Sequence, residues 1–593
     1  MSAAWFPGAA ARTLTVFLVL PLCGQDRSLD DFFREFTDEW VRKNPDQATA
    51  NRYFAGAEQD ALERQMTPRT LEWDIQRVRL AREGLERLRT FDRSRMSPDQ
   101  RLSADILRWR LESAGEGERY RDYRFPFSQF NGANVSLVDS LSVSHPLRTP
   151  RDAENYLARL QQVSLRMDET LAEANRLAQK KMIPPRFILR ATADQMKRFA
   201  ESAPGQNPLV TVFSEKIAGI NSLPIERREE LRAAAERIVR GQVYPSWRKA
   251  IAFVEGLEAG ASDDAGLWRY PGGAQAYAYF LRQNTTTNLS PEEIHGIGLR
   301  EVARIEAEME TILRRLGRSQ GSLQTRVEQL KRDLAYPQTE EGRKQIMADV
   351  EGFMRNAERR AAVLFAQTPQ APVVAEPIPR FQEANAAANY TSPALDGSRP
   401  GTVRIPLRPE AMTRFALRTL TYHESVPGHH YQIALQRENR ALPRFRQINA
   451  FGGFAAFSEG WALYAERLAS DEGWYEGDLE GQLGQLDDEL FRARRLVVDT
   501  GLHAKRWTRR QAIDYGIEPS EVDRYVVNPG QACAYMIGQL KLIELRERVR
   551  RALGERFSLR DYHSLILGIG SAPLDIVERQ VDEFIQANGT RQQ

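Results

Sequence analysis

A short stretch in the last third of the chain gathers side chains that can bind a metal ion. "LTYHESVPGHHYQIALQ" covers residues 420–436 and places three of the seven histidines within residues 423–430. His423 is followed by Glu424, as in H-E-x-x-H, where two histidines one helical turn apart bind zinc and the Glu acts as general base. Pro427 stands where the second histidine of that arrangement would be.

The spacing of these histidines excludes a shared ion on a straight helix. His423 and His429 would point about 120° apart, and His423 and His430 would be about 10.5 Å apart along the axis. Zinc–nitrogen bonds are only about 2.0–2.1 Å long. Pro427 interrupts helical hydrogen bonding, and Gly428 accepts backbone angles closed to other residues. We therefore expect a local bulge that brings His429 or His430 back toward His423.

The residues before the motif predict a helix that buries His423. Met412, Ala416, Leu420 and His423 fall on one face at helical spacing, with Glu424 at its margin. The alternative is one buried histidine whose ring is hydrogen-bonded within the protein, followed by two surface histidines at a helix end. Three histidines, a Glu and a Pro-Gly pair in one stretch favour a metal site.

A second pair of polar residues lies further along the chain. "RRLVVDTGLHAKRW" places Asp499 and His503 at i and i+4. Such an Asp can orient an imidazole that hydrogen-bonds the substrate or a metal ligand. Alternatively, Asp499 pairs with Arg495 on the helix surface. The residues alone favour neither interpretation.

The amino-acid composition and the motifs that the sequence lacks argue against several kinds of function. The chain has 593 residues, 42% of them hydrophobic, and a formal net charge of +3. It contains no concentrated basic block, so nucleic acid is not an expected partner. It also lacks a Gly-x-Ser-x-Gly elbow, a Cys-x-x-Cys pair, a phosphate loop and a dinucleotide fingerprint.

Residues 1–24 have the layout of a secretory signal. Arg12 precedes a short apolar core, residues 13–22, which is too short to span a bilayer. "LPLCG" also resembles a bacterial lipoprotein box, which would attach lipid to Cys23. We expect an exported protein, periplasmic or membrane-anchored, that meets the membrane only through this lipid. Cys533 is the only other cysteine, so the mature chain has no internal disulfide.

Helical periodicity dominates the chain and predicts a mainly α fold. Thr149 and Pro150 begin one predicted helix, and Ser290 with Glu293 forms a capping box for another that ends at Gly317. Other amphipathic helices are predicted at 71–88, 98–111 and 226–257, the last with a kink at Pro245.

The organisation of the chain changes after residue 366. A proline-rich region at 367–401 separates a helical N-terminal region, 25–366, from the histidine-bearing region, 367–593. We expect these two regions to interlock within one helical body. The clearest strand-like run is "GTVRIPL", residues 401–407.

Four motifs occur in a fixed order: "YHESVPGHHYQ", "FSEGWALYAE", "VVDTGLHAKRW" and "NPGQACAYMIGQLKL". Together they resemble a large bacterial family of unknown function, many of whose members are called lipoproteins. That family is distantly allied to the thimet-oligopeptidase-like and Taq-carboxypeptidase-like zinc peptidases, the gluzincins. The resemblance covers roughly residues 30–585. It implies a zincin-like fold: an elongated helical bundle with a deep cleft and a small β element near the active site.

The resemblance also implies roles for individual residues. His-Glu-Ser-Val-Pro-Gly-His resembles the thimet-type His-Glu-x-Gly-His with two residues inserted. Matched in this way, His423 and His429 bind the metal and Glu424 is the general base. His430 then contacts a metal ligand or the substrate.

Later motifs complete the implied site. The third ligand in the allied enzymes is a Glu on a following helix, here Glu459, with Glu466 two turns along the same face as its competitor. Ala455 and Ala462 beside Glu459 would let this helix approach the histidine helix. A late-helix Tyr stabilises the oxyanion in those enzymes, and this role falls to Tyr535. His503 is expected to be a further catalytic residue, and the other residues expected to contact a ligand or the substrate are Asp499, Arg495 and Gln539.

The expected function is zinc-dependent hydrolysis of short peptides, with one Zn²⁺ and Glu424 activating water. The strand at 401–407 would offer an open edge to the peptide around Val403. Two alternatives remain open. One is an exported helical protein that binds zinc or a peptide without turnover, and the other is a hydrolase of a non-peptide amide or ester.

Overall fold

The computed structural model describes residues 28–378, 383, 387–395, 397, 399–408 and 412–589. The expected signal segment and Cys23 lie outside these residues. The described chain is mainly helical with one small three-stranded sheet, which confirms the expected mainly α class. Among the described helices, none combines the length and the apolar character needed to cross a bilayer.

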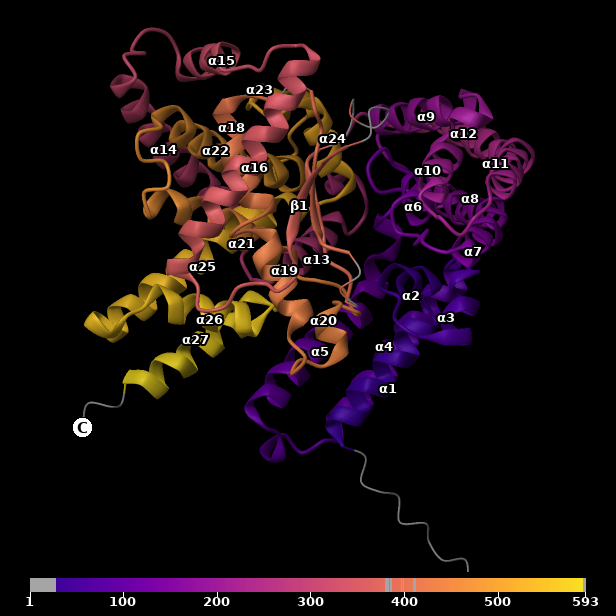
Figure 1. The fold of residues 1–593 in the computed structure, drawn as a ribbon, viewed down its shortest axis with the longest axis horizontal. Helices are drawn as coiled ribbons and strands as arrows, with labels where there is room; N and C mark the ends of the chain where they lie inside the picture. Colours follow the sequence, from indigo (N-terminus) through magenta and orange to yellow (C-terminus); the bar gives the residue numbers. More distant parts are fainter. Residues whose placement is uncertain are drawn as a thin grey trace, which may run out of the picture.

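The helices of the first half gather on one side of the molecule (Figure 1, indigo to magenta). Their starts follow the capping signals: the Thr149 side chain accepts from the N–H of Asp152. The predicted helix at 226–257 is divided by a π-helical turn, Val239–Val243, just before Pro245. The helices are α1 (Leu29–Arg42), α2 (Pro45–Asn51), α3 (Gly56–Glu63), α4 (Leu71–Arg89), α5 (Pro98–Gly117), α6 (Ala133–Ser142), α7 (Pro150–Leu160), α8 (Val163–Gln179), α9 (Arg186–Glu201), α10 (Pro208–Ala218), α11 (Ile225–Ile238) and α12 (Tyr244–Gly256).

The later helices form the other side of the molecule (Figure 1, red to yellow). The predicted capping box of Ser290 and Glu293 begins α14, and Gly317 follows its end with positive φ. The helices are α13 (Gly273–Thr285), α14 (Pro291–Arg315), α15 (Leu323–Asp333), α16 (Glu340–Leu364), α18 (Arg414–Glu424), α19 (His429–Glu438), α20 (Arg444–Gln447), α21 (Ala455–Asp471), α22 (Leu479–Ala504), α23 (Arg509–Asp514), α24 (Pro519–Val527), α25 (Ala534–Leu553), α26 (Leu559–Ile569) and α27 (Leu574–Gly589).

The sheet has the strand order β1-β3-β2. β1 (Val373–Pro377) runs parallel to β3 (Gly401–Ile405), and β2 (Asn389–Thr391) runs antiparallel to it. The predicted strand is therefore present as β3. The expectation that it offers an open edge to a peptide is wrong, because Val403 pairs with Ala375 on one side and Tyr390 on the other.

The hydrophobic cores show how the two halves are joined. One core contains only residues between Met66 and Ala261, and another contains residues between Leu267 and Leu574. A third joins α1, α4 and α5 to α21, α25 and α26. The helices α13 to α15 thus pack with helices of the histidine-bearing region. The third core contains residues from both sides of residue 366, and the division into two regions stays a prediction.

Candidate metal centre

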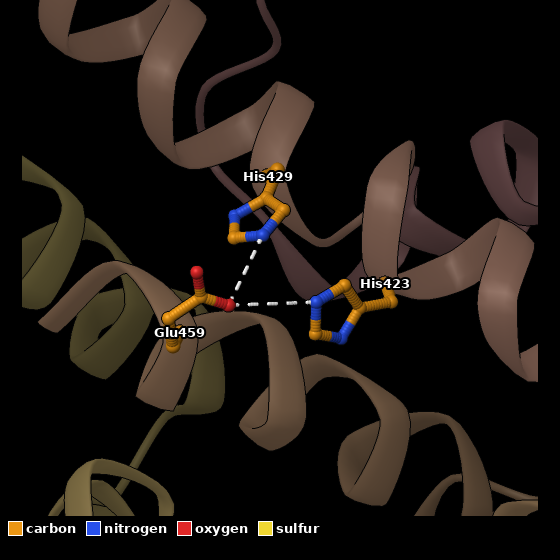
Figure 2. Close-up of side chains that lie close together, drawn as sticks. All are labelled: His423, His429 and Glu459. Atoms are coloured by element: carbon orange, nitrogen blue, oxygen red, sulfur yellow. Dashed lines mark ion pairs between the residues drawn. The ribbon is translucent and has the colours of Figure 1, made fainter. Parts of the chain in front are cut away.

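Three side chains from three helices converge at one point (Figure 2). The Oε2 atom of Glu459 on α21 lies 3.7 Å from Nε2 of His423 on α18 and 3.5 Å from Nε2 of His429 on α19. One ligand atom from each of the three residues lies within 4.8 Å of the others. His423 is buried, while His429 and Glu459 keep partial contact with solvent.

The break between α18 and α19 brings the two imidazoles together. α18 ends at Glu424 and α19 begins at His429, with a cis Val426–Pro427 peptide between them. The N–H of Gly428 donates to the carbonyl of Tyr422, 3.1 Å away. A Cβ atom on Gly428 would lie 2.0 Å from the carbonyl oxygen of His423, so only glycine fits. The expected bulge in one helix is thus a complete break between two helices, and it leaves the two ring centroids 4.8 Å apart.

Contacts on either side of Glu459 fix α21. The indole N–H of Trp461 donates to the carbonyl of Pro427, 2.9 Å away, and so ties α21 to the α18–α19 break. A Cβ atom on Gly460 would lie 2.5 Å from the Cα atom of Gly538 on α25. The closest helix approach beside Glu459 is therefore made by glycines toward α25. We expected Ala455 and Ala462 to let α21 approach the histidine helix. The close contact made by Gly460 and Gly538 is a different one, between α21 and α25.

Glu466 orients His423 from behind. Its Oε1 atom lies 2.6 Å from Nδ1 of His423, and its side chain is only 1% exposed. A carboxylate only accepts, so Nδ1 carries the proton and Nε2 faces Glu459. Burial opposes protonation of His423, but the carboxylates of Glu459 and Glu466 outweigh it and raise its pKa to about 10. Glu466 is therefore a partner of His423 and lies outside the three-residue cluster.

The cluster fits a zinc ion. Two imidazole nitrogens and one carboxylate oxygen are a donor set of catalytic zinc sites. Bonds of about 2.05 Å at tetrahedral angles place donor atoms about 3.3 Å apart, close to the two separations from Glu459. Burial opposes ionisation of Glu459, but hydrogen bonds to His423 and His429 hold its pKa well below the usual range. The carboxylate is therefore charged and ready to bind a cation.

Glu424 stands beside the cluster as the last residue of α18. It is 7% exposed and forms no hydrogen bond or ion pair with other described residues. Its carboxylate is therefore available to accept a proton from a water molecule at the cluster.

His430 faces the sheet. Its Nδ1 atom lies 2.9 Å from the hydroxyl of Tyr390 on β2, and a Cβ atom on Gly401 of β3 would lie 2.7 Å from the same nitrogen. Burial lowers the pKa of His430 to about 4, so the ring is neutral. The structure thus groups His429, and not His430, with His423. Tyr390 was missed by sequence reasoning because nothing in its strand signals a polar partner.

Tyr535 lies in the first turn of α25, close to the cluster. The guanidinium of Arg495 packs over its ring, with Cζ 4.6 Å from the centroid. Burial and then the negative charge of Glu459 raise the pKa of Tyr535. The phenol therefore stays protonated and can donate a hydrogen bond. Arg495 also donates to Tyr525 and Glu521, which fixes its position against Tyr535.

Asp499 and His503 do not contact the cluster. Asp499 accepts from the hydroxyl of Tyr277 at 2.6 Å and from the N–H of Gly530 at 3.0 Å, and burial raises its pKa to about 7. Nδ1 of His503 accepts from the N–H of Leu267, so Nε2 carries the proton and donates to a backbone carbonyl. Both expectations are corrected: Asp499 pairs with neither His503 nor Arg495, and the ring of His503 is occupied by backbone groups.

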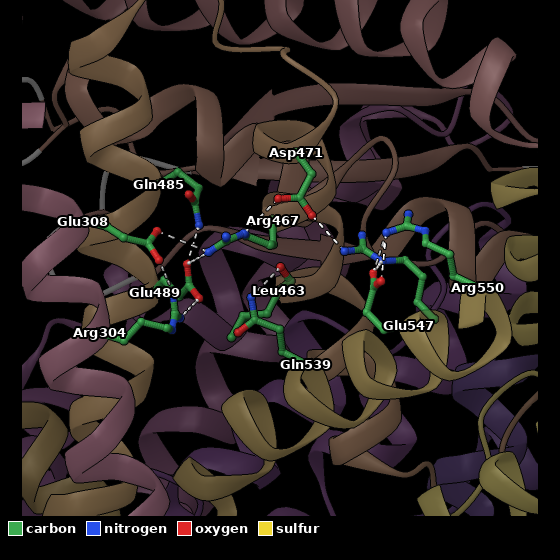
Figure 3. Close-up of polar contacts among 11 residues, drawn as sticks. Arg304, Glu308, Leu463, Arg467, Asp471, Gln485, Glu489, Gln539, Glu547 and Arg550 are labelled. Carbon is green, nitrogen blue, oxygen red and sulfur yellow. Dashed lines mark hydrogen bonds and ion pairs between the residues drawn. The ribbon is translucent and has the colours of Figure 1, made fainter. Parts of the chain in front are cut away.

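Gln539 joins two helices (Figure 3). Its side-chain amide donates to the carbonyl of Leu463 at 3.3 Å and so links α25 to α21. Its Oε1 atom has no hydrogen-bond partner among the described residues, so the expected contact with the substrate or a ligand stays a prediction. One turn further along α21, Arg467 pairs with Glu308 of α14 and Glu489 of α22 (Figure 3). These contacts hold the helix that carries Glu459.

Comparison with known proteins places the chain in a family. Residues 45–581 match the family described as bacterial protein of unknown function (DUF885), so the chain belongs to this family. A solved structure described as the putative lipoprotein from Colwellia psychrerythraea is 31% identical, with a TM-score of 0.89 over 95% of this chain and 100% of that one. Another, a putative lipoprotein of unknown function from Shewanella oneidensis, is 17% identical, with a TM-score of 0.69 over 93% of this chain and 99% of that one, and shows the fold alone. No curated protein matches.

Proposed function

We propose that this member of the DUF885 family is a zinc-dependent hydrolase of short peptides, working in a zincin-like cleft. The observation that carries the proposal is the convergence of His423, His429 and Glu459 from three helices, with Glu424 next to His423 in the chain and close enough for its charge to act on that imidazole. Three protein ligands leave one position for water or substrate, which is typical of catalytic zinc. Structural zinc sites usually have four protein ligands and are rich in cysteine.

The side chains divide the chemistry among them. A zinc ion held by His423, His429 and Glu459 would act as a Lewis acid toward the scissile carbonyl and lower the pKa of a water molecule. Glu424 accepts a proton from the attacking water and delivers it to the leaving amine as the C–N bond breaks. The protonated phenol of Tyr535 donates a hydrogen bond to the developing oxyanion. Glu466 accepts the Nδ1 proton of His423, so Nε2 is the nitrogen that binds a metal once it has released its own proton.

The choice of peptides as substrates rests on the distant alliance of this family to zinc peptidases that the resemblance implies. The proposal also includes export. The two similar structures are described as lipoproteins, and residues 1–24 have the layout of a secretory signal with Cys23 in a lipoprotein-like box. We therefore place the mature protein in the periplasm or on a membrane through a lipid on Cys23.

The experiment compares the mature wild-type protein with Glu424→Gln. Zinc content is measured by mass spectrometry, and a mixed peptide library is analysed for cleavage products. We expect about one zinc per chain in both proteins and a rate at least about 100-fold lower in Glu424→Gln. Equal rates would exclude Glu424 as the base. Zinc in both proteins with no cleavage by either would make the chain a binding protein, and cleavage of only esters or non-peptide amides would change the substrate class.

A further inference from the structure

A cavity of about 840 Å³ lies between helices of the first half and α13, next to the end of α24. It has the volume of a small-molecule or peptide-binding site, for which about 300–1,000 Å³ is usual. None of the three cluster residues lines it. Four arginines and four carboxylates do: Arg69, Arg77, Arg121, Arg124, Asp46, Asp74, Glu118 and Glu173.

Most of the carboxylates in this lining are neutralised by arginines outside it. Three of the four form close ion pairs with such arginines, at 2.5–2.6 Å. The fourth, Asp74, has no ion pair with a described residue, and burial raises its pKa. The three pairs are Asp46 with Arg159, Glu118 with Arg82, and Glu173 with Arg176.

The arginines of the lining are not neutralised in the same way. Arg69 donates to the hydroxyl of Ser136, and Arg77 donates to the carbonyl of Trp40 and stacks on its indole. Arg124 packs over the ring of Phe280, with Cζ 4.8 Å from the centroid. Among the described residues, none of these three arginines has a carboxylate within ion-pair distance, and Arg121 reaches Glu118 only at 3.8 Å. The cavity therefore has a surplus of positive charge.

The arginines that carry this surplus positive charge line the cavity, where they can bind an anion. Burial lowers the pKa of Arg69, Arg77 and Arg124, but the guanidinium of arginine remains protonated in proteins. Arg124 lines the cavity and is exposed to solvent. A guanidinium presents paired N–H donors in a planar fork that matches the two oxygens of a carboxylate.

One chain segment connects the cavity to the candidate metal centre. Asn528 lines the cavity, and Tyr535 lies seven residues later beside Glu459. Between them, Gly530 packs closely on α13, where a Cβ atom would lie 2.9 Å from the N atom of Leu281. Gln531 accepts a hydrogen bond from Arg524. One short segment, from Asn528 to Tyr535, therefore runs from the cavity lining to the neighbourhood of Glu459.

We propose that this cavity binds the carboxylates of an acidic peptide, so that peptides carrying Asp or Glu residues are the preferred substrates. This inference rests on the proposed function for its link to turnover, but binding alone tests it. The arginines would bind the acidic side chains while the scissile bond lies at the cluster. Neutral peptides would lose these contacts and bind less tightly.

The test uses Glu424→Gln as the background, so that no turnover disturbs binding. Binding of the peptide Ala-Glu-Ala-Glu-Ala and of its Gln counterpart is measured by calorimetry. We expect the Glu peptide to bind at least ten-fold more tightly, and its affinity to fall with added salt. Arg124→Gln should weaken binding of the Glu peptide by roughly 10- to 100-fold and leave the Gln peptide unaffected. Arg121→Gln, at a second position, should act in the same direction.

Arg79→Gln is the matched control, because Arg79 is exposed on α4 but does not line the cavity. Equal affinity for the two peptides, or unchanged Glu-peptide affinity in both cavity variants, would overturn the inference. Tighter binding of tripolyphosphate than of the Glu peptide would overturn the assignment to peptides. If the wild type hydrolyses no peptide but the Arg-dependent binding persists, the hydrolase proposal fails while the anion-binding cavity stands.

Discussion

Two substitutions of Glu466 test whether its contact with His423 positions this histidine to bind a metal ion. Nδ1 of His423 lies 2.6 Å from Oε1 of Glu466, and both side chains are buried. Glu466→Gln keeps an acceptor for the Nδ1 proton but removes the charge. Glu466→Ala removes both and leaves a buried N–H without a partner.

The expected losses follow from this geometry. Removing the carboxylate partner of a metal-binding histidine typically lowers metal affinity about 10- to 100-fold, which is about 1.4–2.7 kcal/mol at about 1.4 kcal/mol per decade. We expect Glu466→Gln to lower zinc affinity by about 10-fold, the lower limit of this range. Glu466→Ala should lower zinc affinity by close to 100-fold, because it also leaves the buried Nδ1–H of His423 without an acceptor, which costs about 1–3 kcal/mol.

The assay is zinc competition with a chromophoric chelator on the mature protein. Glu472→Gln is the control, since Glu472 is exposed at the C-terminal cap of the same helix. Its affinity for zinc should equal that of the wild type. Wild-type affinity in both Glu466 variants would refute the idea that this carboxylate orients a metal-binding imidazole. An equal loss in Glu472→Gln would show that the assay reports only net charge.

Three further predictions concern neighbouring residues. Tyr535→Phe should lower kcat by about 10²–10³-fold with zinc content and KM unchanged; an unchanged kcat in steady-state kinetics would remove the oxyanion role. Gly428→Ala should lower stability by about 1–3 kcal/mol and reduce zinc content, whereas Gly352→Ala, whose Cβ would meet no atom within 4 Å, should do neither in thermal melts and metal analysis. Burial raises the folded-state pKa of Asp499 to about 7 from its ordinary value of 3.8, so the native state holds more protons than the unfolded state between these pH values. Wild-type stability should therefore fall relative to Asp499→Asn as pH rises from about 4 to about 7, by up to roughly 4 kcal/mol, and denaturant titrations with parallel pH profiles would contradict this.

Local signals in the sequence were good guides to helices and to the candidate centre. Capping residues such as Thr149 and Ser290 act on their own neighbours, so they mark helix starts without knowledge of the fold. The Pro427-Gly428 pair predicted a local bulge for the same reason, and the structure has a full break between two helices there. His423, His429 and Glu459, which the motifs point to, lie together in space.

Long-range contacts explain what sequence reasoning could not reach. Asp499 and His503 share a helix face, but partners from distant segments, Tyr277 and Leu267, determine what each one binds. The central position of β3 depends on two neighbouring strands, so its own residues do not reveal that both edges are paired. Likewise, the close approach of Gly460 to Gly538 depends on how α21 and α25 pack against each other.

The adjacent pair His429 and His430 allows the most direct test of the metal centre. The account predicts that His429→Ala loses most of its zinc, because His429 is in the cluster, and that His430→Ala keeps it, because His430 contacts Tyr390. Zinc per chain, measured on the two purified variants side by side, reports this difference. Full zinc in His429→Ala together with loss in His430→Ala, or no zinc in the wild type after zinc is supplied, would contradict the account.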